Sequence, residues 1–265
     1  MPKGKNISRA DPGKEFVKIV ESMAYSRSRR DVFNDFVEMA YCSLRQLVDP
    51  KDEIEKRYMG IIKRYKPEEV REKLPKLMSL TTIAVSAGGS DFLGHAGGLM
   101  ELFAGNDQFF TPYSIARFMA EIILAEVEEV IEHQGVVTMQ EPACGAGALA
   151  IAAADVVETK GFKLNEHLYV EAIDVALICY QMTYVQLSLR GVAAIVRHGN
   201  TLSNQYWDSI YTAAMFPIVY EKLLKLRAAR AVEEKEPLSP TMTATTNLGQ
   251  IGFDFMPARK EQGTE

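Results

Sequence analysis

Hydrophobic residues recur at helical spacing through the first 85 residues. One stripe consists of Phe16, Ile19, Val20 and Met23, and a second consists of Val32, Phe33, Phe36, Val37, Met39 and Ala40. Stripes of this kind indicate the core-facing sides of amphipathic helices rather than a cofactor site. We therefore expect a helical lobe over residues 1–90, ended by the glycine-rich segment 87–98.

Short apolar runs then alternate with helix-like segments. The runs cover residues 136–139, 168–174 and 191–196. Upstream, Thr111 and Pro112 make a good start for an amphipathic helix, in which Ile115, Phe118, Met119 and Ile122 are expected to face inward. Strands that alternate with helices predict an α/β fold, here over residues 91–236. Residues 237–265 are rich in Pro, Ser and Thr, which predicts a flexible tail.

A glycine-rich segment, EPACGAGA at 141–148, joins the first of these runs to a helix. Gly145 and Gly147 allow a sharp turn and a close approach of backbone to ligand, where helix N-terminal N–H groups point. The segment is either an ordinary tight turn or a nucleotide-cofactor loop, and its neighbours favour the loop. Asp174 ends the second run, where a carboxylate can accept both ribose hydroxyls of an adenosine, and Asn200 follows the third, beside the adenine.

Together these segments resemble the S-adenosylmethionine-dependent N6-adenine DNA methyltransferases. The likeness is strongest to the modification subunits of type I restriction systems and their stand-alone phage and plasmid relatives, and it covers roughly residues 90–217. It implies a Rossmann-like class I methyltransferase core, with a helical lobe that helps to enclose DNA, and S-adenosylmethionine as the cofactor. The residues that it implies for the cofactor site are Phe110, Thr111, Glu141, Ala143, Gly145, Asp174 and Asn200.

The same resemblance implies a catalytic signature after the fourth strand: Asn or Asp, then Pro-Pro, then Tyr, Phe or Trp. The segment in that place is WDSIYTAAMFP at 207–217, and the signature falls on Ala213, Ala214, Met215 and Phe216. Only the aromatic residue remains, and we expect Phe216 to stack on an extruded base. Loss of a preorganised polar contact at the reacting centre costs about 10²–10³ in rate.

The sequence after Pro217 holds one helix, 218–236, and the tail, whereas a full sheet of this family needs three more strands. We therefore expect a partial sheet with its fourth strand at an open edge. Such an edge invites pairing with a second copy, with a partner methyltransferase or restriction subunit, or with the tail. In the tail, QIGFDF at 250–255 resembles peptides that dock on the bacterial sliding clamp; alternatively its alternating apolar residues cover the sheet edge, which the commonness of that spacing favours.

Composition and charge narrow the class of protein. The chain has 265 residues, of which 47% are hydrophobic, enough for a substantial core. A net charge of −5 does not by itself favour DNA binding, but basic residues gather at 1–9, 26–30 and 56–66, either as a DNA surface or as solvated helix faces. No apolar run reaches membrane length and no signal peptide is recognised, so a cytoplasmic protein is expected. The resemblance implies a bacterial, phage or plasmid origin. Three cysteines and four scattered histidines lack metal-ligand spacing, so no metal is expected.

Two classes of function fit this sequence. The first is a DNA adenine-N6 methyltransferase of reduced or partner-dependent activity, belonging to a restriction-modification system. The second is a regulatory or antirestriction subunit that keeps a cofactor pocket or DNA surface but has lost the chemistry. The intact cofactor motifs favour the first, and the AAMF segment with the missing strands favours the second.

Overall fold

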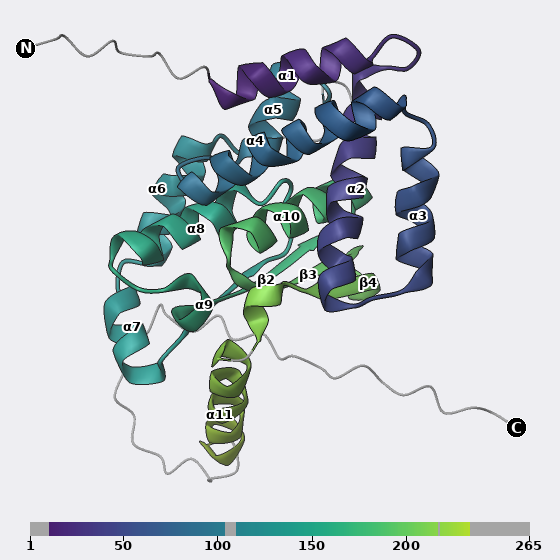
Figure 1. Cartoon of the computed structure of the whole chain (residues 1–265). Helices are drawn as coiled ribbons and strands as arrows, with labels where there is room; N and C mark the ends of the chain where they lie inside the picture. Colours follow the sequence, from purple (N-terminus) through teal and green to yellow (C-terminus); the bar gives the residue numbers. More distant parts are fainter. Residues whose placement is uncertain (1–10, 104–109, 217, 234–265) are drawn as a thin grey trace, which may run out of the picture.

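Four strands form one sheet in the computed structural model, which describes residues 11–103, 110–216 and 218–233 (Figure 1). They are β1 (Val137–Glu141), β2 (Leu168–Asp174), β3 (Ala193–Asn200) and β4 (Gln205–Tyr211), in the spatial order β1-β2-β3-β4. β1, β2 and β3 are parallel, whereas β4 runs antiparallel to β3. The carboxyl ends of the three parallel strands and the amino end of β4 therefore lie at the same end of the sheet, which we call the carboxyl edge.

Helices cover both faces of this sheet. Those that precede it are α1 (Pro12–Met23), α2 (Arg29–Val48), α3 (Asp52–Ile62), α4 (Leu74–Ala87), α5 (Phe92–Leu99), α6 (Tyr113–Ile123) and α7 (Val127–Gln134). The later ones are α8 (Ala148–Thr159), α9 (Leu164–His167), α10 (Leu177–Arg190) and α11 (Ile218–Glu233), with a short 3₁₀ turn at Ala213–Met215. α8 and α10 pack on one face of the sheet, and α2 packs against α10. α9 and α11 lie toward the other face (Figure 1).

The helical prediction for the N-terminal region is confirmed for the described residues. The second predicted stripe is entirely buried, and the first is buried at Phe16, Val20 and Met23. The Phe16 ring packs edge-on against Phe36 and Phe92, with ring centroids 5.3 and 5.5 Å apart. The hydrophobic core is therefore continuous from the N-terminal helices to the α/β unit.

The prediction that the apolar stripe of α6 faces inward is wrong. Its large side chains are exposed, by 51% at Ile115, 61% at Phe118, 41% at Met119 and 61% at Ile122. The buried side of α6 consists instead of Ala116 and Ala120, which face α8. α8 is itself rich in buried alanines, and small side chains on both helices let them approach closely. Periodicity gave the apolar side of this helix but not the side that packs.

β4 lies at an edge of the sheet, as predicted, and its antiparallel direction decides where the residues after it lie. Because β4 is antiparallel, its end lies beside the start of β3. The N–H of Thr212 donates to the carbonyl of Ala194 at 3.0 Å, and its hydroxyl donates to the carbonyl of Val192 at 2.6 Å. The 3₁₀ turn Ala213–Met215 therefore lies at the amino ends of β1, β2 and β3, opposite the carboxyl edge.

Four arginines in the basic segments of the N-terminal helices form ion pairs where the structure describes them. Their ion pairs are Arg27–Asp35, Arg29–Glu21, Arg57–Glu38 and Arg64–Asp35. This pattern favours the interpretation as solvated helix faces over that of a DNA surface. Among the helices of the described ranges, none combines the length and the apolar character that crossing a membrane requires.

Candidate cofactor site

The segment 141–148 forms a tight loop between β1 and α8, as predicted. Gly145 and Gly147 both have positive φ, +55° and +93°. A Cβ on Gly145 would lie 3.1 Å from the ring of Phe110, and one on Gly147 would lie 3.1 Å from the hydroxyl oxygen of Thr183. The loop therefore depends on glycine for its backbone conformation and for its close contacts.

Asp174 is anchored to this loop. Its Oδ2 accepts a hydrogen bond of 2.8 Å from the N–H of Gly145, and its Oδ1 accepts one of 2.8 Å from the N–H of Ala176. Each carboxylate oxygen keeps a second lone pair for a ligand hydroxyl. The predicted acid thus lies next to the predicted glycine loop, at the carboxyl ends of neighbouring parallel strands, where α/β sheets bind ligands.

Two polar side chains of α10 donate hydrogen bonds to backbone carbonyls of the 141–148 loop. Neither was predicted from the sequence. The Thr183 hydroxyl donates to the carbonyl of Gly145 at 2.9 Å. Gln186 is fully buried; its Nε2 donates to the carbonyl of Ala146 at 2.7 Å and to Oδ1 of Asp91 at 2.6 Å, and its Oε1 accepts from the N–H of Leu93 at 3.1 Å. The sequence feature that could have predicted their role is a Thr and a Gln three residues apart on an otherwise apolar side of the helix.

Gln186 therefore ties the loop to the start of α5. Asp91, the residue before α5, also accepts from the N–H of Gly94 at 3.0 Å and so caps that helix. Burial raises the pKa of Asp91 to about 6, against the opposing effect of the hydrogen bond from Gln186. Loop, α5 and α10 form one hydrogen-bonded unit.

A Gln186→Leu variant is expected to lower the free energy of unfolding by about 2–4 kcal/mol, because it leaves Asp91, the Ala146 carbonyl and the Leu93 N–H without their buried partner. Urea denaturation measures the loss. Gln181→Leu is the matched control on the same helix: Gln181 is 3% exposed, and its Nε2 makes no hydrogen bond within the described residues. It should cost less than about 1 kcal/mol, and equal losses in the two variants would show that the Gln186 network is not what stabilises the loop.

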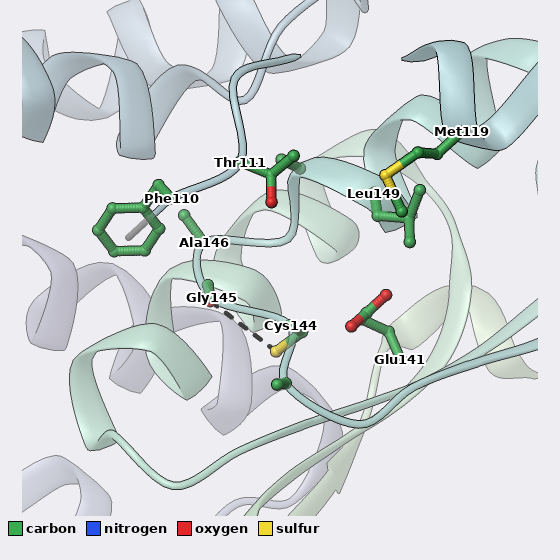
Figure 2. A pocket seen from close by; sticks show the side chains of 10 residues that line it. Phe110, Thr111, Met119, Glu141, Cys144, Gly145, Ala146 and Leu149 are labelled. Atoms are coloured by element: carbon green, nitrogen blue, oxygen red, sulfur yellow. Dashed lines mark hydrogen bonds between the residues drawn. The ribbon is translucent and has the colours of Figure 1, made fainter. Parts of the chain in front are cut away.

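A cavity of about 110 Å³ opens beside the loop, between it and α6. In Figure 2 the carboxylate of Glu141 points toward the space below Met119 and Leu149. The lining residues are Phe110, Thr111, Met119, Glu141, Ala143, Cys144, Gly145, Ala146, Ala148 and Leu149. Its volume is below the roughly 300–1,000 Å³ of pockets that enclose a whole drug-sized ligand, so it is too small to enclose a whole nucleoside-containing cofactor.

Five of the seven predicted cofactor residues line this cavity: Phe110, Thr111, Glu141, Ala143 and Gly145. Asp174 lies next to it through its bond to Gly145. Asn200 does not line it; its Oδ1 accepts from the N–H groups of Leu202 and Ser203, at 3.0 and 3.3 Å, and shapes the turn after β3. That turn reaches the loop through Thr201, whose hydroxyl donates to the carbonyl of Pro142 at 2.7 Å.

The acidic character of the site fits a cationic ligand. Burial raises the pKa values of Glu141 and Asp174, while backbone N–H groups, of Ala143 for Glu141 and of Ala176 and Gly145 for Asp174, act in the opposite direction. A ligand with positive charge near these carboxylates would stabilise their ionised forms. Burial also raises the pKa of Cys144 well above 9, so its thiol stays protonated and acts as a small packing group.

Phe216 is not brought to this site. It is 52% exposed and lies just past the 3₁₀ turn, at the opposite edge of the sheet from the loop, with the rings of Tyr211 and Tyr220 6.2 and 6.0 Å away. The physical reason is the antiparallel direction of β4, which carries Ala213, Ala214 and Met215 to that edge as well. Met215 is buried against the second face of the sheet.

The match to known families agrees with this geometry. Residues 90–222 match the model of the family described as N-6 DNA methylase. The chain belongs to the N6 DNA methylase family. The matched residues contain the glycine loop, Asp174 and the Gln186 network, and S-adenosylmethionine is the cofactor that this family implies. The predicted Rossmann-like class I methyltransferase core is confirmed, with four strands in the described residues.

Among solved structures, this N6 DNA methylase is similar to a protein from Listeria monocytogenes described as a class I S-adenosylmethionine-dependent methyltransferase. The two share 18% identity with a TM-score of 0.42, over 73% of this chain and 55% of that one. This chain thus spans about half the length of that structure. No curated protein matches it.

The site fits S-adenosylmethionine by its own features. Gly145 leaves space where a Cβ would meet Phe110, Asp174 presents a carboxylate for hydroxyl groups, and Glu141 faces the cavity. No group of His, Cys, Asp and Glu suited to a metal ion occurs in the part of the chain that the structure describes.

Proposed function

We propose that this N6 DNA methylase catalyses methylation of adenine N6 in DNA, with activity that is reduced or depends on a partner. The observation that carries the proposal is the intact loop, cavity and carboxylate at the carboxyl edge of the sheet, within a chain whose family match covers that edge. When bound, S-adenosylmethionine supplies an activated methyl group.

The chain's own residues then have distinct roles. Asp174 holds the ribose hydroxyls, and the Gly145 backbone accommodates the methionine portion beside Phe110, Thr111, Glu141 and Ala143. Asn200 shapes the turn on the adenine side of the site. Thr183 and Gln186 position the loop without touching the cofactor.

The reduced or partner-dependent activity is supported by the sequence, because the Asn/Asp-Pro-Pro-aromatic signature does not occur in the 265 residues. The AAMF segment does not replace it, since it lies at the opposite end of the strands from the cofactor loop. Within the described residues β1 and β4 each have one hydrogen-bonded neighbour, so each edge of the sheet is open to another strand. A second copy, or a partner methyltransferase or restriction subunit, is the proposed source of what is missing.

The same observations support the second candidate, a cofactor- or DNA-binding regulatory or antirestriction subunit without methyl transfer. A cytoplasmic location and a role in restriction-modification belong to both proposals. The suggested sliding-clamp peptide and the alternative edge strand, residues 250–255, lie outside the described residues.

Mass spectrometry of N6-methyladenine in DNA from a methylation-free bacterial host decides between the two candidates without knowledge of the target sequence. Expression of the chain is expected to raise N6-methyladenine above the empty-vector level, and an Asp174→Ala variant should bring it back. The regulatory subunit would be established instead by two results together. Calorimetry would show S-adenosylmethionine binding, and mass spectrometry would show no methyladenine in hosts with or without a partner subunit.

A further inference from the structure

A β-bulge at Trp207 distinguishes the carboxyl edge of the sheet. His198 on β3 pairs with Asp208 on β4, but its neighbour Gly199 pairs with Tyr206, so the register passes over Trp207. A Cβ on Gly199 would lie 2.5 Å from the carbonyl oxygen of Gln205 and 2.7 Å from the ring of Tyr206, so glycine is needed for this close approach. Bulges re-aim a side chain and are frequent next to active sites.

The indole of Trp207 contacts His198, the residue of β3 that pairs with the predicted cofactor acid Asp174 on β2. Its ring lies edge-on to the ring of His198, with centroids 4.7 Å apart, and His198 in turn stacks on Tyr180 at 5.6 Å. Nε2 of His198 lies 3.2 Å from the carbonyl oxygen of Val175, the residue after Asp174. Two successive contacts therefore connect Trp207 to the end of β2.

Folding alone does not account for this tryptophan. Its side chain is 56% exposed, so most of the hydrophobic gain from burying an indole is absent. Val175, Leu177 and Leu202 are exposed as well, by 60%, 45% and 100%, in the segments that follow β2 and β3 at the same edge. Single exposed apolar residues are ordinary, but an exposed aromatic ring that shares the ligand end of an α/β sheet with several of them indicates a binding surface.

We propose that Trp207 is a stacking platform for an unpaired base of the DNA substrate. Enzymes that modify a base take it out of the duplex and stack it against aromatic side chains, and an indole offers a large flat face for that contact. Trp207 is at the edge where the cofactor loop lies, whereas Phe216 is at the other. The ring does not line the loop cavity, which leaves the cavity to the cofactor. The inference rests on the proposed function in DNA methylation.

The chain contains a single tryptophan, so its fluorescence reports on this position alone. The full-length protein, with S-adenosylhomocysteine present, is titrated with a single-stranded 20-mer of mixed sequence and with the corresponding duplex. We expect the single strand to quench the emission more than the duplex does. By fluorescence anisotropy of the labelled strand, Trp207→Ala should weaken binding about 5- to 100-fold and Trp207→Phe less than about 5-fold, since any aromatic ring supports stacking.

Phe216→Ala is the matched control, because Phe216 is about as exposed and lies at the other edge; it should leave the affinity unchanged. Equal binding by wild type and Trp207→Ala would overturn the inference alone. Quenching by S-adenosylmethionine without DNA, together with loss of only cofactor affinity in Trp207→Ala, would also overturn it and assign the ring to the cofactor's adenine. A wild-type protein that binds no oligonucleotide would overturn the proposed function, and the inference with it. Circular dichroism of each variant separates these results from misfolding.

Discussion

Gly145→Asp is expected to abolish S-adenosylmethionine binding. The new Cβ would lie 3.1 Å from the Phe110 ring, and φ at this position is +55°, where residues other than glycine are strained. The variant would also add a carboxylate to the wall of a cavity that Glu141 lines, at a residue hydrogen-bonded to Asp174, and burial already raises the pKa values of both acids. Isothermal calorimetry with S-adenosylmethionine measures the effect, which should exceed about 100-fold, since clash and like-charge repulsion act together.

The matched control is Gly161→Asp, at another glycine with positive φ, +86°, beyond the end of α8. No atom lies within 4 Å of the position of its Cβ, so this variant has the backbone strain without the clash or the charge near the site. Its cofactor affinity should equal that of the wild type. Cofactor binding by Gly145→Asp at wild-type strength would show that the cofactor does not contact this loop.

Asp208→Ala is expected to lower the free energy of unfolding by about 2–4 kcal/mol, because the Arg45 side chain, only 7% exposed, loses the partner of its buried charge, although Asp208 itself is 34% exposed. Oδ2 of Asp208 accepts hydrogen bonds from Arg45 on α2, from the Tyr41 hydroxyl at 3.1 Å and from the Tyr180 hydroxyl at 3.2 Å. Burial acts to raise the pKa of Asp208, but the hydrogen bond and charge of Arg45 lower it. The variant would leave the buried Arg45 with the Tyr41 hydroxyl as an acceptor and with Asp49, at 3.4 Å, as its remaining acidic partner among the described residues.

Urea denaturation with matched slopes gives this loss directly. Glu38→Ala is the control, because it removes the partner of Arg57 from a half-exposed ion pair and should cost less than about 1 kcal/mol. Asp208→Asn keeps one acceptor oxygen and should fall between the two. If Asp208→Ala and Glu38→Ala lose the same amount, the cluster is a surface contact and does not fasten α2 to the sheet.

The glycine loop and the carboxylate next to it could be predicted because they depend on local sequence signals. The glycines at 145 and 147 have the positive φ that their spacing suggested, and Asp174 ends a strand that is buried along its whole length. Gln186 could not be predicted in the same way. Its partners, Ala146, Leu93 and Asp91, are distant in sequence, and only the packing of α10 against the loop and α5 brings them together.

The direction of β4 was predictable in principle, because only Thr201–Asn204 separate β3 from β4. A parallel pair needs a crossover of about a dozen residues or more, so a connection this short requires a hairpin. The expectation for Phe216 rests instead on the resemblance of this segment to the family's fourth strand. A strand's side-chain alternation is the same in either direction, so the length of the connection was the decisive signal.

α6 illustrates how a helix can be held by its least conspicuous residues. Ala116 and Ala120 make its contact with α8, and neither depends on the identity of the side chains on the outer side. Ile115, Phe118 and Ile122 therefore add little to the stability of the fold, although they dominate the composition of the helix. Polar substitutions at those three positions are therefore expected to leave the protein folded, although they remove most of the apolar surface of the helix.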